Sequence, residues 1–122
     1  MAARAIAEPA LAPMGLSPKG FGALAILVRE GPLSQQRLGA RQGVDRTTTV
    51  AVVDELERAG FVERRRDPSD RRAYSLHPTA KGRRVLERAR EAATRAEDEF
   101  LAPLPAADRI RLKQMLRTLL SP

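Results

Sequence analysis

The sequence predicts a mainly α-helical fold with one small β-hairpin. One observation is that apolar residues recur at three- and four-residue steps in several segments. Most of these segments begin after a Ser, Thr or Asp that can cap a helix. The second is that residues 61–76 instead have the form of a hairpin around a proline-containing turn. The length of 122 residues is typical of a single domain and allows a modest hydrophobic core.

The first segment, residues 1–16, is expected to be a shortened N-terminal region. Pro9 and Pro13 interrupt any long helix, which leaves room only for a remnant at about Ala3–Glu8. The segment lacks the long apolar core of a secretion signal, so a cytoplasmic location is expected.

A scaffold helix is expected to follow. Ser17 can cap it, and Pro18 stands at the first helical position, where the missing amide of proline costs nothing. Gly31 ends it. Its apolar side consists of Phe21, Leu24, Ala25, Leu27 and Val28.

Two helices joined by a tight turn come next. Ser34 can cap the first of them, and Gly43 can end it in the left-handed conformation. Asp45 can cap the second, which runs over Arg46–Ala59 until Gly60 stops it. Two helices joined by a short glycine-containing turn form a helix-turn-helix.

The second of these helices has one apolar and one free face. The residues expected to be buried are Thr49, Val52, Val53 and Leu56. The residues expected to lie away from this stripe are Arg46, Thr47, Val50, Ala51, Asp54 and Arg58. Those expected to enter the major groove of DNA are Arg46, Thr47, Thr48, Val50 and Ala51. Guanidinium, hydroxyl and methyl groups of this kind can bind base edges in the major groove. The alternative is an ordinary surface helix whose Thr-rich start merely caps itself.

The hairpin concentrates positive charge. Its turn is Asp67–Asp70, and five arginines flank it, namely Arg64, Arg65, Arg66, Arg71 and Arg72. These arginines could be a solvated edge, but beside a helix-turn-helix they favour a winged helix-turn-helix that contacts DNA. Arg71 and Arg72 would enter or approach the minor groove, with Asp70 orienting one of them. Arg64, Arg65 and Arg66 would contact the DNA backbone or join that same ion network.

The C-terminal part predicts two further helices. Thr79 can cap a long helix that ends near Leu101, and Asp108 lies in the first turn of a last helix. The apolar stripe of the last helix is Leu112, Met115, Leu116 and Leu119. These helices could close a core within one chain, but an exposed apolar stripe on so small a chain favours a partner.

The block GVDRTTTVAVVDELERAGFVERRRDPSDRRAYSLHPTAKG resembles the central part of the MarR (multiple antibiotic resistance regulator) family of bacterial transcription factors. The resemblance extends more loosely from about Leu16 to Leu120. It implies a winged helix-turn-helix over residues 17–78, with a short strand near Pro32–Leu33 pairing with the wing. It also implies a dimerisation region over residues 79–122.

A homodimer built in this way would place two recognition helices about one DNA turn apart, on a palindromic operator. The resemblance further implies a small-molecule effector bound between the dimer helices and the winged part. Its walls would come from the helix around Phe21–Val28 and from the start of the helix after Thr79. The shortened N-terminal segment departs from the family pattern, in which a full first helix helps to build the dimer.

Composition limits the remaining alternatives. Lys and Arg outnumber Asp and Glu by 22 to 15, which gives a net charge of +7 and favours a polyanionic partner such as double-stranded DNA. Without cysteine the chain has no thiol switch, and no long apolar segment predicts a membrane span. The single histidine, His77, and the lack of a metal-ligand or phosphate-loop motif argue against an enzyme, a metal site or a cofactor.

The predicted function is therefore that of a sequence-specific transcriptional regulator, expected to repress. The competing interpretation is a winged-helix module that binds proteins and little or no DNA. One feature supports this alternative: the recognition helix carries Ala51 and Glu55 where the family often has polar or basic groups, and Asp54 and Glu57 add negative charge nearby.

Overall fold

A computed structural model describes residues 10–120, apart from the side chains of Asp70, Arg71, Arg72 and Leu120. The predicted helical remnant at Ala3–Glu8 lies outside the described residues.

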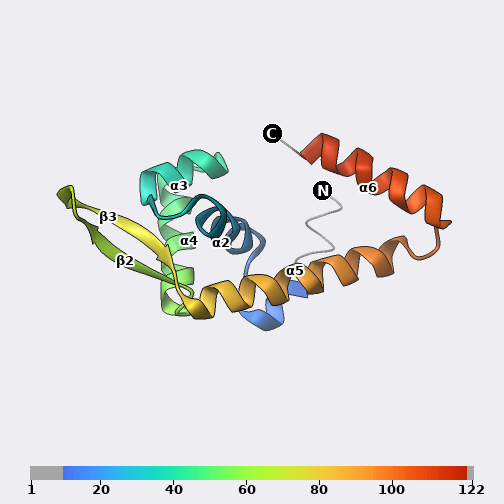
Figure 1. The fold of residues 1–122 in the computed structure, drawn as a ribbon, viewed down its shortest axis with the longest axis horizontal. Helices are drawn as coiled ribbons and strands as arrows, with labels where there is room; N and C mark the ends of the chain where they lie inside the picture. Colours follow the sequence, from blue (N-terminus) through green and yellow to red (C-terminus); the bar gives the residue numbers. More distant parts are fainter. Residues whose placement is uncertain (1–9, 121–122) are drawn as a thin grey trace.

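The elements follow one another as η1 (Ala12–Met14), α2 (Pro18–Glu30), β1 (Leu33–Ser34), α3 (Gln35–Gln42), α4 (Arg46–Arg58), β2 (Val62–Asp67), β3 (Asp70–Pro78), α5 (Ala80–Leu101) and α6 (Ala106–Leu120). A compact body contains α2, α3 and α4, and the β2–β3 hairpin projects from one end of it (Figure 1). The long α5 leaves the body in the opposite direction, and α6 turns back along the far half of α5 (Figure 1). The prediction of a mainly α-helical chain with a small β wing is confirmed.

All four predicted N-caps are present. The side-chain oxygens of Ser17, Ser34, Asp45 and Thr79 each accept a hydrogen bond from the backbone N–H three residues further on. Gly43 has the left-handed conformation, with φ 68°, so that it ends α3 and lets the chain turn directly into α4. These local features explain why the helices begin and end where the sequence predicts.

The sheet is antiparallel with the strand order β1-β3-β2, and Leu33 of β1 pairs with Leu76 of β3. The short strand expected beside the wing is therefore confirmed. At the tip of the hairpin, the Asp67 carboxylate accepts hydrogen bonds from the N–H and the hydroxyl of Ser69, which lower the pKa of Asp67. His77 lies on β3, where its Nε2 is 2.9 Å from the hydroxyl oxygen of Ser75.

One hydrophobic core joins the body to the first half of α5. The predicted stripe of α4 is buried, and the core also contains Leu24, Leu27, Leu38, Leu76, Val85 and Leu86. In contrast, large apolar side chains at the far end of α5, in the turn that follows it and on α6 are exposed to solvent: Phe100, Leu104, Ile110, Met115 and Leu119. None of the helices that the structure describes is both long and apolar enough to cross a membrane.

The start of α5 touches the chain that leads into the wing. The Thr79 hydroxyl donates a 2.6 Å hydrogen bond to the carbonyl of Gly60, and the N–H of Thr79 donates one of 3.0 Å to the carbonyl of Phe61. Gly82 packs so closely on this turn that a Cβ added to it would lie 2.1 Å from the Phe61 carbonyl oxygen. The base of the wing and the start of α5 are thus joined by backbone contact.

Candidate nucleic-acid interface

The two helices of the helix-turn-helix meet at a glycine. A Cβ on Gly39 of α3 would lie 2.6 Å from Oγ1 of Thr49 on α4. The Thr49 side chain is 2% exposed, and its hydroxyl donates a 2.8 Å hydrogen bond to the carbonyl of Asp45. The angle between α3 and α4 therefore depends on the absence of a side chain at Gly39.

Gly39→Ala should destabilise the fold by about 1–3 kcal/mol, because the added methyl group must push the hydrogen-bonded Thr49 side chain aside. Thermal unfolding followed by circular dichroism would measure this loss. Combining Gly39→Ala with Thr49→Ala removes the clash. The double variant should therefore lose less stability than the two single variants lose together. Additive losses would show that the helices do not meet at this point.

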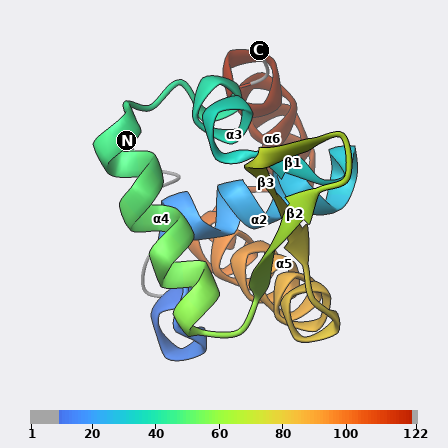
Figure 2. The ribbon, with the colours of Figure 1, turned by 90° about the vertical axis from the view of Figure 1, so that its left-hand side faces the viewer.

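The candidate base-reading residues at the start of α4 differ in exposure. Arg46, Thr47 and Ala51 are exposed, whereas Thr48 and Val50 are partly buried. Figure 2 looks onto this side of the molecule, with α4 on one flank and the β2–β3 hairpin on the other. The start of α4 and the wing thus lie on the same side of the molecule.

Asp45 holds the start of α4 in place. Its carboxylate accepts hydrogen bonds from Thr48, which lower the pKa of Asp45 below its ordinary value of 3.8. Because the pKa of Asp45 is lower in the folded than in the unfolded protein, its carboxylate stabilises the fold at every pH above the pKa of the unfolded state. This stabilisation is lost as the pH falls through the pKa of the folded state. The cap is therefore fully charged at neutral pH.

The arginines of β2 differ in their partners. Arg64 forms ion pairs with Asp54 and Glu57 of α4, at 3.2 and 3.1 Å. Arg65 pairs with Glu63 on its own strand, and the guanidinium carbon of Arg66 lies 5.9 Å from the centre of the Tyr74 ring on β3. Arg64 thus belongs to an ion network with α4. This network differs from the one around Asp70 that the sequence suggested, so both roles expected for these arginines stay predictions.

The remaining predicted wing residues are Asp70, Arg71 and Arg72. Their backbone is part of β3, at the end of the hairpin farthest from the body, but their side chains lie outside the described part of the chain. The predicted orientation of an arginine by Asp70 therefore stays a prediction.

The acidic residues of α4 do not all face outward with the candidate base-reading residues. Glu55 accepts a 2.9 Å hydrogen bond from the hydroxyl of Ser17, the residue that caps α2, and its carboxylate lies against Gly20. Asp54 and Glu57 face Arg64. The acidic residues that supported the protein-binding alternative thus have partners within the fold, a fact that only the tertiary contacts reveal.

A cleft of about 780 Å³ lies between α3, α4 and the wing, with Gln35, Arg46, Thr49, Arg64 and Tyr74 among the residues lining it. The helices expected to form the effector walls, α2 and the start of α5, do not line this cleft, and the effector site stays a prediction. The apolar side of α2 and the first half of α5 pack within the hydrophobic core.

Comparisons with known proteins agree with this architecture. A family model described as the MarR family matches residues 16–74. A putative transcriptional regulatory protein for the hcr operon of Thauera aromatica is 37% identical over 105 residues, which cover 86% of this chain and 63% of that protein. The chain thus spans less than two thirds of the length of this relative.

Two further relatives are matched over most of their length. The HTH-type transcriptional repressor Rv2887 of Mycobacterium tuberculosis is 33% identical over 110 residues, which cover 90% of this chain and 79% of the repressor. The crystal structure of CouR from Rhodococcus jostii RHA1, bound to p-coumaroyl-CoA, has a TM-score of 0.73 and 28% identity, and the match covers 98% of this chain and 85% of CouR. Together with the winged helix-turn-helix, these matches show that the chain belongs to the MarR family, whose members are transcriptional regulators and not enzymes.

Proposed function

We propose that the protein binds double-stranded DNA in a sequence-specific manner and regulates transcription in the cytoplasm. The observation that carries this proposal is the common orientation of the exposed first turns of α4 and the arginine-bearing wing (Figure 2). The residues that would read bases in the major groove are Arg46, Thr47, Thr48, Val50 and Ala51. Arg65, Arg66, Arg71 and Arg72 of the wing would contact phosphates or the minor groove, with Asp70 as an orienting group.

The acting species would be a homodimer on a palindromic operator. Support comes from the exposed apolar side chains beyond residue 99, which would be costly to leave in water and which a second copy could cover. Residues 79–122 would then supply the dimerisation region, and residues 17–78 the DNA-binding region. A two-fold axis through the dimer would make the two recognition helices read equivalent half-sites.

Repression is the proposed mode, because the similar Mycobacterium protein is named a repressor. The CouR structure contains p-coumaroyl-CoA, which supports a small-molecule effector as part of the proposal. Such an effector would have to bind the DNA-competent and the free arrangement of the dimer with different affinities.

Fluorescence anisotropy tests the proposal directly. Labelled duplex DNA from the intergenic region upstream of the protein's own gene, and a random duplex of equal length, would be titrated across a series of salt concentrations. Tighter binding to the upstream duplex, with an affinity that falls steeply as salt rises, is the expected result. Lack of binding to either duplex at low salt would reject the proposal in favour of a winged-helix module that binds proteins.

Thr47→Ala and Arg46→Ala should separate base reading from phosphate contact. Loss of the Thr47 hydroxyl should reduce the preference among operator variants, by about 1–3 kcal/mol at the base that it contacts. If Arg46 reads a base, Arg46→Ala should likewise reduce the preference among operator variants. If Arg46 contacts a phosphate, the variant should bind all sequences more weakly, with a salt slope lower by about one. A uniform loss for Thr47→Ala would show that this side chain only positions the helix.

A further inference from the structure

We infer that Arg64 is a positioning residue, which fixes the orientation of the wing relative to the recognition helix instead of contacting DNA. The inference rests on the proposed DNA-binding function and refines it, because it removes one of the five wing arginines from the DNA contacts and assigns two acidic residues of α4 a role in binding.

The geometry of the ion pairs supports this role. The Arg64 guanidinium donates from Nε to Oε2 of Glu57 at 3.1 Å and from Nη2 to Oδ1 of Asp54 at 3.2 Å. Asp54 and Glu57 are three residues apart on one helix, so their side chains project from the same face. Two different nitrogens of one planar group are therefore held by two points along the axis of α4, which restrains both the distance and the direction of β2.

The other described arginines of the hairpin make no comparable link. Arg65 pairs with Glu63 on its own strand, and Arg66 stacks on Tyr74 of the neighbouring strand. Both contacts stay within the hairpin. Beyond its base, the hairpin projects away from the body (Figure 1), so ion pairs close to the base can set its angle.

The charge of the cluster also argues against a phosphate contact by Arg64. One guanidinium lies between two carboxylates, and the three groups together carry a net charge of −1. A phosphate approaching Arg64 would meet this net negative charge, and binding it would require the guanidinium to give up its present partners. The side chain of Arg64 is 34% exposed, less than the 60% of Arg65, which leaves Arg65 more accessible to DNA.

A distance measurement without DNA tests the inference by itself. Because the sequence contains no cysteine, spin labels can be attached at Ser69→Cys in the wing turn and Gln36→Cys on α3. Labelled protein diluted with unlabelled protein should give a narrow distance distribution within one chain. Adding Asp54→Asn and Glu57→Gln together should broaden or shift this distribution, and an unchanged distribution would overturn the inference.

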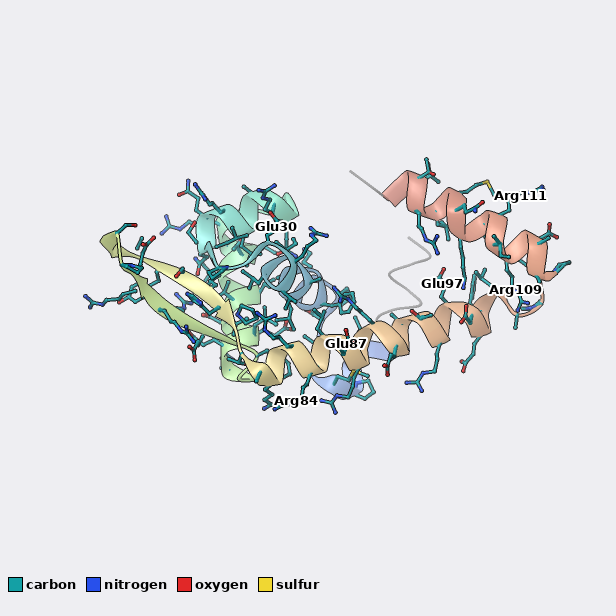
Figure 3. The ribbon with its side chains drawn as sticks, in the orientation of Figure 1. Glu30, Arg84, Glu87, Glu97, Arg109 and Arg111 are labelled. Carbon is teal, nitrogen blue, oxygen red and sulfur yellow. The ribbon has the colours of Figure 1, made fainter. Side chains whose placement is uncertain are left out.

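A matched control removes the same charge elsewhere. Glu87 and Glu91 are exposed and lie one turn apart on α5, and Figure 3 shows Glu87 on this helix at a distance from the wing. Glu87→Gln with Glu91→Gln changes the net charge equally but should leave the distance distribution as it is in the parent protein. Broadening in the control as well would show that the response is not specific to Arg64, and the inference would fail.

The sign of the effect on DNA affinity provides a second test. Removing two negative charges near DNA should strengthen binding if only charge matters, and by more than the same change in the control pair, which lies farther from the wing. If the two carboxylates hold Arg64 and the wing, Asp54→Asn with Glu57→Gln should instead weaken binding to the upstream duplex, about threefold to tenfold for the loss of two partly exposed pairs. Stronger binding by this variant would overturn the inference.

The salt dependence separates positioning from contact. Arg64→Gln should weaken binding with nearly the parent salt slope, whereas Arg66→Gln should lower the slope by about one. A slope lowered equally by Arg64→Gln would identify Arg64 as a phosphate contact. If the parent protein binds no duplex at all, the proposed function fails, while the distance measurement still decides whether Arg64 fixes the wing.

Discussion

Gly82→Ala should lower the free energy of unfolding by about 3 kcal/mol, which corresponds to a melting temperature lower by roughly 10 °C. The reason is that the new Cβ would lie 2.1 Å from the carbonyl oxygen and 2.9 Å from the carbonyl carbon of Phe61. These are backbone atoms, which cannot rotate away as a side chain can. The start of α5 would have to move off the turn, which would strain the hydrogen bonds of Thr79 to Gly60 and Phe61.

Thermal unfolding at one fixed protein concentration would measure this effect, since dimerisation makes melting temperatures depend on concentration. Gly22→Ala is the matched control. It is the same substitution inside a helix, but the nearest atom to its Cβ is the side-chain amide nitrogen of Gln42 at 3.3 Å, which can shift slightly. The control should change stability by less than about 1 kcal/mol, the size of the helix-propensity difference between glycine and alanine. Equal effects at both positions would show that the contact of α5 with the wing base is not tight.

Met115→Glu should convert the proposed dimer into a monomer and weaken operator binding at least about a hundredfold. The Met115 side chain is 51% exposed on α6, one turn before the exposed Leu119, so a carboxylate there does not disturb the core of one chain. In a dimer, the same carboxylate would be buried without a partner. A monomer can occupy only one half-site at a time, which removes the gain of roughly 10²–10⁴ that linked binding provides.

Light scattering would give the mass of the variant, and anisotropy its affinity for the upstream duplex. Arg117→Glu is the control, because Arg117 is exposed on the opposite side of the same helix and receives the same side chain. We expect the control to remain dimeric. A dimeric Met115→Glu variant with unchanged affinity would place the dimer interface on another surface and contradict the proposed role of α6.

The local structure of this protein follows from its sequence. Ser17, Ser34, Asp45 and Thr79 can be identified as caps from the sequence because each acts on an amide only three residues away. The same holds for the turn at Gly43, where a left-handed residue ends α3. The buried stripe and the free first turns of α4 follow from helical periodicity, which is also a local property.

Only the tertiary structure decides how the charged residues are used. Asp54, Glu55 and Glu57 look alike in the sequence, yet Glu55 binds Ser17 on α2 while the other two hold Arg64 of the wing. Periodicity places a side chain on one side of its helix, but it does not say which other element lies there or which partner that element offers. The partner depends on the distance and direction between α2, α4 and β2, and these are set by close contacts such as Gly39 on Thr49 and Gly82 on Phe61. Contacts of this kind join separate segments, and the hydrogen bond between Ser17 and Glu55 spans 38 positions, so no pattern within a single segment contains them.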